Sequence, residues 1–225
     1  FVAGVTLAEV YGFLAYLSRD RLRNQNSRTA EYGLNAASRA RKIATIRSFY
    51  KYLTVKAKLL ETNPVQDLDS PKVPKMLPRY LTLEESRRLL SAVDSRNRER
   101  DYCIICIFLN CGLRISEIVG LNLSDIRQDN LRVVGKGGKE RVVYINDAVA
   151  QAINDYLAVR REIDAIDKNA LFLSTRRTRM SREAVHSMVK KSLLAAGLDA
   201  SKYSSHKLRH TAATLMLQNG VDVRT

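Results

Sequence analysis

The prolines divide this 225-residue chain, because all four of them lie between residues 64 and 78. Proline has no backbone N–H to donate and disfavours a helical backbone in the residue before it, so a helix cannot continue through this segment. We therefore predict an interdomain linker over residues 69–78. It separates an N-terminal domain, residues 1–68, from a C-terminal domain, residues 79–225.

The N-terminal domain is predicted to be all-α. Thr6 followed by Glu9 is the pattern of a capping box, and apolar residues recur at helical spacing after it. A second helix is indicated by an apolar face that runs from Ile43 to Leu53.

The C-terminal domain is predicted to be mainly α with a small antiparallel β-sheet. A capping box at Thr82 and Glu85 opens one helix. Further helices are expected over residues 101–111, 115–121, 147–160, 181–196 and 206–219. Residues 131–134 and 141–145 are β-rich and flank a glycine-rich turn, which predicts a hairpin. Residues 171–173 are expected to form a short strand.

The charge of the chain favours a polyanionic partner. Lys and Arg total 38 against 23 Asp and Glu, a formal net charge of +15, and nucleic acid is the usual partner of such a surface. A membrane partner is not expected, because the sequence has no apolar run of about 18 uncharged residues and no basic amphipathic helix with a bulky apolar face.

Seven of the basic residues, and no acidic one, lie between positions 39 and 58. On a helix with an apolar face, these charges must crowd the solvent side. A simply solvated face is the alternative, but solvated faces usually mix both signs. An unbroken positive face is better explained as a surface for DNA phosphates. The residues predicted to contact DNA here are Arg39, Arg41, Lys42, Arg47, Lys51 and Lys56.

The three cysteines, Cys103, Cys106 and Cys111, share one apolar stretch. The C-x-x-C spacing of the first two would suit zinc or redox chemistry, but zinc needs a second ligand pair and none is near. We predict that they are small apolar residues of a buried helix. An odd, clustered cysteine count fits a reducing compartment, so a cytoplasmic location is expected.

Arg114 and Glu117 are the first candidates for chemistry. Arg114 follows a predicted helix end and interrupts an apolar segment, and Glu117 shares its helical face. An ion pair within the helix is one interpretation, and the spacing alone favours it no more than the other. The other is a functional arginine, because an arginine that only meets solvent has no reason to lie between two apolar residues.

His206, Arg209 and His210 are the second candidates, because their spacing places them on one face at a helix start. A zinc site is disfavoured, since Arg209 would repel the cation and H-E-x-x-H is absent. Arginine binds phosphate oxygens with a planar fork, imidazole transfers protons, and a helix N-terminus adds a positive end.

The hairpin turn contributes Lys136 and Lys139. The turn is neither a P-loop nor a dinucleotide fingerprint, and a tip lysine is usually solvated. Together with the arginines and a histidine, however, a lysine suits a phosphodiester carried to a pentavalent state. That state needs its charge neutralised and its leaving oxygen protonated. No cluster of Asp and Glu suggests bound metal ions, so no cofactor is expected.

At this point the sequence resembles the tyrosine recombinases, most of all the Xer-type and the related transposon or phage integrases. The resemblance rests on three segments, Gly112-Leu-Arg-Ile-Ser-Glu117, Gly135-Lys-Gly-Gly-Lys-Glu-Arg141 and His206-Lys-Leu-Arg-His-Thr211. Each motif alone is weak, but three in order at the right separations are strong. The similarity covers nearly the whole chain, from a helical core-binding domain through the linker to a catalytic domain.

The resemblance implies roles for the matching residues. Arg114 and Arg209 would bind the scissile phosphate, and Lys136 would protonate the leaving 5′ oxygen. Lys139 takes that role if the hairpin register differs. His206 would assist proton transfer.

The remaining matches have supporting roles by the same resemblance. Glu117 would hold the site together, and His210 would pack or buttress rather than react. Lys139 and Arg141 are counted with the DNA-binding residues. The family's nucleophilic tyrosine is expected after the Arg209 helix, and none of the ten tyrosines stands there. The catalytic domain is therefore expected to be truncated at its C-terminus, so that the chain as given binds DNA without cleaving it.

The intact protein is thus expected to be a site-specific recombinase of double-stranded DNA. By the resemblance it cleaves through a 3′-phosphotyrosyl link, exchanges strands through a Holliday junction as a homo-tetramer, and needs neither ATP nor metal. Three alternatives stay open on the sequence. They are a non-catalytic helical DNA-binding regulator, an RNA- or ribosome-binding protein and a metal-dependent nuclease.

Overall fold

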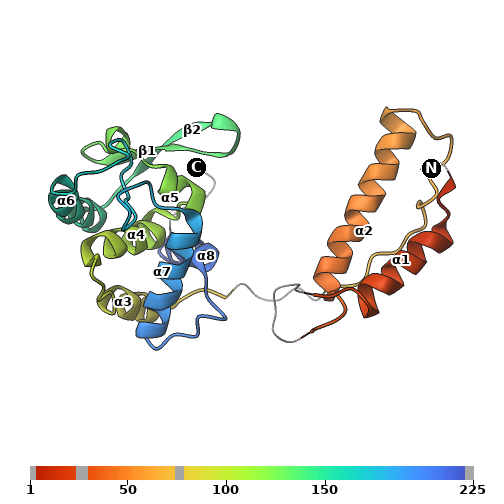
Figure 1. The fold of residues 1–225 in the computed structure, drawn as a ribbon, viewed down its shortest axis with the longest axis horizontal. Coiled ribbons are helices and arrows are strands. Elements are labelled where there is room, and N and C mark those ends of the chain that lie inside the picture. The colour runs from red at the N-terminus through yellow and green to blue at the C-terminus, as the bar shows by residue number, and fades with distance from the viewer. Residues whose placement is uncertain (1–3, 24–29, 74–78, 221–225) are drawn as a thin grey trace. The chain divides into compact units, whose positions relative to one another are not determined.

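The computed structural model describes residues 4–23, 30–73 and 79–220, with the side chain of Lys136 outside the described part. The chain forms two compact units, Phe1–Met76 and Leu77–Thr225, which Figure 1 shows as two groups of helices. The division falls within the predicted linker, of which residues 74–78 lie outside the described part. Neither the described stretch 57–73 nor residues 79–82 contain a helix or a strand.

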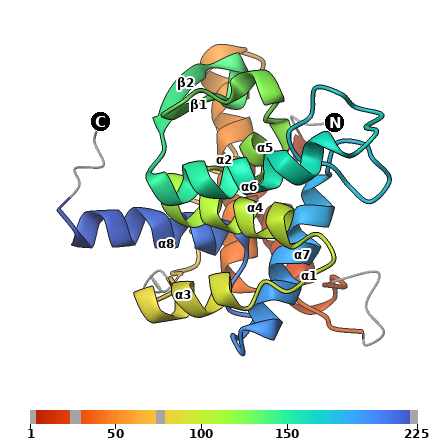
Figure 2. The same cartoon turned by 90° about the vertical axis from the view of Figure 1, so that its left-hand side faces the viewer.

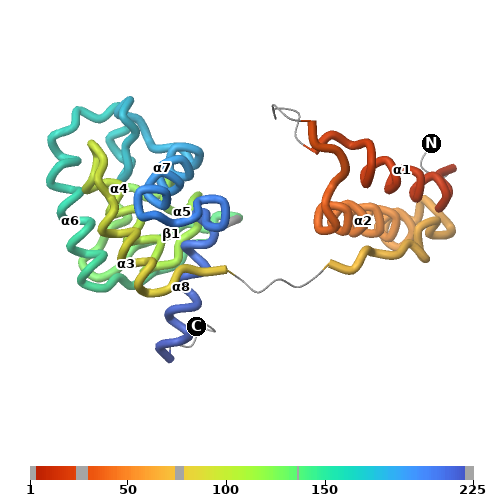
Figure 3. The backbone as a smooth tube through the Cα atoms, turned by 90° about the horizontal axis from the view of Figure 1, so that it is seen from below, coloured from red at the N-terminus to blue at the C-terminus, as the bar shows by residue number. Residues whose placement is uncertain are grey.

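The first unit is built on two helices, α1 (Leu7–Arg19) and α2 (Ala36–Lys51), which lie side by side in Figures 1 and 3. The predicted capping box opens α1: the backbone N of Thr6 donates to Glu9 Oε2 at 2.7 Å, and the backbone N of Glu9 donates to Thr6 Oγ1 at 3.3 Å. A π-helical turn, η2 (Tyr52–Lys56), continues α2. The core of this unit contains Val10, Ile43, Tyr50, Leu53, Val65 and Leu68.

The second unit is mainly helical. Its helices are α3 (Leu83–Ser91), α4 (Arg98–Cys111), α5 (Ile115–Gly120), α6 (Asp147–Arg161), α7 (Arg182–Ala195) and α8 (Ser205–Gln218), with a 3₁₀ turn, η3 (Leu123–Asp125). A two-stranded antiparallel sheet pairs β1 (Asn130–Val134) with β2 (Glu140–Tyr144). A 3₁₀ turn, η4 (Lys136–Gly138), joins the strands. The predicted fold class, mainly α with a small antiparallel sheet, is confirmed.

Helix α4 forms the centre of the second unit, as Figure 2 shows, with α6 and α8 packed against it. Ile104, Ile105, Ile107 and Phe108 are completely buried, because a helix that is apolar on all sides must be covered on all sides. Cys103 and Cys106 are buried in the same helix. Burial raises the pKa of Cys106 to about 11, so this thiol is protonated and packs as an apolar group.

The strand predicted at residues 171–173 is wrong. These residues are buried, but their backbone N–H groups donate to different kinds of acceptor. The N of Leu171 donates to the Leu121 carbonyl at 2.9 Å, and the N of Leu173 donates to the Tyr156 hydroxyl at 3.2 Å. Leu173 forms one isolated bridge, with Arg179. A side chain and two separate segments cannot provide the continuous ladder that a strand requires.

Candidate functional site

The end of α4 brings two distant motifs together. Gly112 ends the helix with a φ of 58°, a left-handed conformation that a residue without Cβ adopts readily. The Gly112 carbonyl accepts a hydrogen bond from Arg209 Nη1 of α8. A Cβ built on Gly112 would lie 3.5 Å from the Cβ of Ala212. The start of α5, which carries Arg114, is therefore held against the helix that carries Arg209.

The carboxylate of Glu117 lies at the centre of the site and is 2% exposed. Its Oε1 accepts from Arg114 Nη1 and from Arg141 Nη1, each at 3.0 Å. Its Oε2 accepts from the backbone N of Arg114 at 2.8 Å and from Arg141 Nη2 at 2.9 Å. Burial acts to raise the pKa of Glu117, but hydrogen bonds from Arg141 and Arg114 outweigh it and lower the pKa to about 2.

Arg209 completes the cluster, with Nη1 lying 3.9 Å from Glu117 Oε2. Burial and the nearby charge of Arg114 lower the pKa of Arg209, while Glu117 opposes them. The side chains of Arg114, Arg141 and Arg209 are 52%, 40% and 35% exposed. Three guanidinium groups against one carboxylate leave a local excess of positive charge that is open to an anion from solvent.

The hairpin turn begins at this cluster. A Cβ built on Gly135 would lie 3.5 Å from Arg141 Nη1 and 3.8 Å from Glu117 Oε1, so the backbone that precedes Lys136 runs directly beside the ion pair. The predicted role of the Lys136 side chain falls outside the described part of the chain. Lys139 is exposed, and its carbonyl accepts from the backbone N of Gly135 at 2.7 Å.

The histidines are less involved than the arginines. His206 is exposed in the first turn of α8, one turn before Arg209. Within the described residues, it makes no hydrogen bond with the Glu117 cluster. His210 is also exposed, and its expected role, to pack or buttress rather than react, stays a prediction. The buried side of α8 carries Leu208, Thr211 and Ala212 instead.

The predicted DNA surface of the first unit lies on α2 and η2. Arg41, Lys42, Arg47, Lys51 and Lys56 are exposed, while Arg39 is half-buried. No ion pair involves any of these six in the described ranges 4–23, 30–73 and 79–220, which leaves their charges available to an external anion. Their contact with DNA stays a prediction.

Two residues that the sequence did not single out position the site. Arg179 donates from Nη1 to the carbonyls of Val119 and Leu121, both at 3.0 Å, and so caps the end of α5. Thr211 Oγ1 accepts from the backbone N of Leu81 at 2.9 Å, which ties the start of the second unit to α8. Their partners lie about 60 and 130 residues away along the chain, so no local pattern could reveal them. The only signal was that Thr211 is the last residue of the segment that carries His206 and Arg209.

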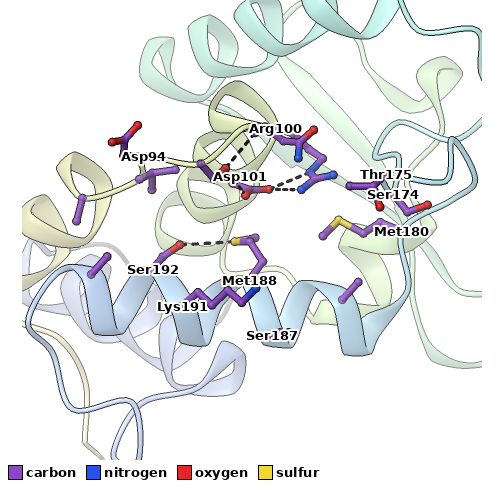
Figure 4. Close-up of a pocket in the computed structure, with 16 residues that line it drawn as sticks. Asp94, Arg100, Asp101, Ser174, Thr175, Met180, Ser187, Met188, Lys191 and Ser192 are labelled. Atoms are coloured by element: carbon purple, nitrogen blue, oxygen red, sulfur yellow. Dashed lines mark hydrogen bonds and ion pairs between the residues drawn. The ribbon is translucent and has the colours of Figure 1, made fainter.

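A cavity of about 490 Å³ lies elsewhere, beside the first turn of α4 and along α7 (Figure 4). The ion pair of Arg100 and Asp101, 2.7 Å apart, lines it together with Met180 and Met188. Arg100 Nη1 also donates to the Leu173 carbonyl at 2.7 Å. None of the predicted site residues lines this cavity, which separates it from the Glu117 cluster.

Two further kinds of feature are absent from the described residues. No three His, Cys, Asp or Glu side chains in these ranges gather as the ligands of a metal ion would. No helix within them has both the length and the apolar character that a membrane crossing requires.

Comparisons with known proteins agree with the geometry. Residues 79–225 match the Phage integrase family. Tyrosine recombinase XerC of Caldanaerobacter subterraneus subsp. tengcongensis is 50% identical over 225 residues, which are 100% of this chain and 61% of that protein. The crystal structure of XerA recombinase is 30% identical, with a TM-score of 0.61, and the match covers 98% of this chain and 72% of that one.

A further solved structure shares the fold. XerH site-specific recombinase bound to palindromic difH substrate, in a post-cleavage complex, superposes with a TM-score of 0.73 at 21% identity, over 98% of this chain and 62% of that one. The family match covers most of the chain, and a relative is 50% identical over the whole length of this chain. The chain therefore belongs to the phage integrase family of tyrosine recombinases.

Proposed function

We propose that the protein is a site-specific DNA recombinase that cleaves and rejoins strands through a 3′-phosphotyrosyl intermediate. The observation that carries the proposal is the convergence of Arg114, Arg141 and Arg209 around the buried Glu117. A related recombinase, XerH, is bound to its difH substrate in a post-cleavage complex. The present chain spans 61% of the XerC relative, so the activity of the whole protein is part of the proposal.

In this reaction a tyrosine oxygen attacks the scissile phosphorus and the bond to the 5′ oxygen breaks. Arg114 and Arg209 bind the non-bridging oxygens, whose negative charge grows in the pentavalent state. Lys136, or Lys139 in a shifted register, gives a proton to the leaving 5′ oxygen, and His206 assists. Each cleavage exchanges one phosphoester for another, so rejoining needs no ATP.

All ten tyrosines precede the Arg209 motif. We therefore propose that these 225 residues bind double-stranded DNA by themselves and receive the nucleophile from outside them. Exchange between two duplexes requires cuts in four strands, which favours a homo-tetramer. We propose that the protein acts in the cytoplasm, on the nucleoid, because its proposed substrate is double-stranded DNA.

Replacing Arg209 with Ala tests the proposal in the full-length protein. A nicked DNA substrate traps the covalent adduct, because the short 5′ strand diffuses away before rejoining. We expect Arg209→Ala to lower the adduct rate by about 10²–10³-fold, as losses of transition-state donors do, with DNA affinity largely kept. Arg176→Ala, at an exposed arginine outside the cluster, serves as the control. A near-normal adduct rate in Arg209→Ala would refute the assigned role.

A non-catalytic DNA-binding regulator is the second candidate. The basic surface of α2 favours it, since that surface explains DNA binding without any chemistry. The two candidates differ in the same assay, because a regulator forms no covalent adduct even with the wild-type sequence. Competition with structured RNA separates both from an RNA-binding protein.

A further inference from the structure

We propose that Arg141 is a positioning residue of the candidate active site, acting through Glu117 rather than through a contact of its own with DNA. The inference rests on the proposed function and deepens it. It replaces the interpretation of Arg141 as a phosphate contact of the hairpin. Three observations carry it: the geometry of the ion pair, the face of the hairpin from which Arg141 projects, and the closeness of the turn backbone.

The ion pair occupies both oxygens of the carboxylate. Arg141 Nη1 and Nη2 donate to Glu117 Oε1 and Oε2 at 3.0 and 2.9 Å, the parallel fork that gives arginine–carboxylate pairs their directionality. The other two hydrogen bonds of Glu117 both come from Arg114. Arg141 therefore fixes the plane of the Glu117 carboxylate. The same carboxylate accepts hydrogen bonds from the backbone N and the side chain of Arg114.

The strand register directs Arg141 toward the protein. Arg141 pairs directly opposite Val133 across the sheet, and directly opposed residues project from the same face. Val133 is completely buried, so this face is the one that packs on the rest of the unit. Because successive residues of a strand alternate in direction, Arg132 projects from the opposite face.

The backbone of the hairpin turn at Gly135 lies close to the ion pair of Arg141 and Glu117. The position of a Cβ on Gly135 is 3.5 Å from Arg141 Nη1 and 3.8 Å from Glu117 Oε1. The ion pair thus ties the base of the hairpin to α5. Without Arg141, Glu117 keeps half of its hydrogen bonds and is free to turn toward Arg209, which lies 3.9 Å away. Glu117 would then neutralise an arginine that should face the phosphate.

The experiment uses the full-length protein and the nicked DNA substrate. Arg141→Lys keeps the charge but loses the fork, because an ammonium is a point donor. Arg132→Lys is the matched control: Arg132 lies on the same hairpin, is 39% exposed against 40% for Arg141, and also pairs with a buried carboxylate, that of Asp125. Adduct rate at saturating DNA, DNA affinity and its salt dependence are measured for each variant and for Glu117→Gln.

We expect Arg141→Lys to slow adduct formation about 10²-fold, the cost of misplacing a catalytic group, while DNA affinity changes less than about twofold. Arg132→Lys should form adduct at the wild-type rate. The double variant Arg141→Lys/Glu117→Gln should be no slower than the slower single variant, because residues that act as one unit lose their effect together.

Other results overturn the inference. If Arg141 contacted DNA itself, Arg141→Lys would lower DNA affinity by more than about twofold and keep the adduct rate at saturating DNA, because the lost fork would then belong to a phosphate contact. Independent action predicts that the two losses multiply in the double variant. If Arg141→Lys reacts as fast as wild type, this inference alone fails. If wild type forms no adduct at all, the proposed function fails and takes the inference with it.

Discussion

At the scale of single residues, Glu117 is a buried carboxylate that stays charged because arginines surround it. Its pKa lies at about 2, below the ordinary value of 4.5, so folding favours the ionised form. A group whose pKa is lowered by folding contributes stability above its unfolded pKa and loses it as the pH falls toward the folded pKa. The site should therefore weaken in acid.

The comparison of wild type with Glu117→Gln tests this. The shift from 4.5 to about 2 corresponds to about 3 kcal/mol of the free energy of unfolding. We expect the stability advantage of wild type over the variant to be constant above about pH 5 and to shrink by about that amount as the pH falls to about 2. Urea unfolding followed by circular dichroism across this range measures it. An advantage that is the same at about pH 3 and about pH 7 would contradict the pKa assignment.

At the scale of elements, the position of α8 decides whether Arg209 reaches the site. Three contacts hold this helix: Arg209 to the Gly112 carbonyl, the packing of Ala212 near Gly112, and Thr211 Oγ1 accepting from the N of Leu81. Thr211 is completely buried and also donates to the Lys207 carbonyl at 2.9 Å. Its hydroxyl thus connects the helix to the segment that follows the linker.

Thr211→Val should show how much the hydrogen bond between the Leu81 amide and Thr211 contributes to stability. Valine has the same shape but no hydroxyl, so the buried amide of Leu81 loses its partner, at a cost of about 1–3 kcal/mol. Hydrogen exchange of the Leu81 amide should become faster. Thr214→Val, at a half-buried position of the same helix, is the control and should change stability by less than about 0.5 kcal/mol. Equal effects of the two variants would show that the hydrogen bond contributes nothing specific.

At the scale of the whole molecule, two groups of basic side chains have different predicted roles. The excess of +15 includes the exposed side chains of α2 and η2, which are predicted to contact phosphates, and the arginines of the Glu117 cluster. Losing the first group should weaken binding to every DNA sequence, whereas losing the second should slow cleavage. These two kinds of effect can be measured separately.

The double variant Lys51→Ala/Lys56→Ala tests the first role. We expect weaker binding to all DNA sequences and a salt slope shallower by about 0.9 for each lysine, since each releases fewer counterions. Adduct formation at saturating DNA should remain. The control removes two exposed lysines of the second unit, Lys168 and Lys191. An unchanged slope in the Lys51/Lys56 variant would rule out this face as the phosphate surface.

Local patterns in the sequence determined much of this protein. The capping boxes at Thr6 and Thr82 and the apolar run of α4 predicted where helices begin and which one is buried. The spacing of Arg114 and Glu117 indicated an ion pair as one of two interpretations, and this ion pair forms. These features depend on residues within about one helical turn, and such neighbours are fixed as soon as the helix forms.

The tertiary structure alone decided what those local pieces meet. It placed Arg141 on Glu117 across 24 residues, Arg209 on Gly112 across 97 and Thr211 on Leu81 across 130. It also prevented residues 171–173 from forming a strand, because their backbone hydrogen-bond partners come from separate segments. Contacts of this kind follow from how helices and hairpin pack around a shared core, and no periodicity along the chain encodes that packing.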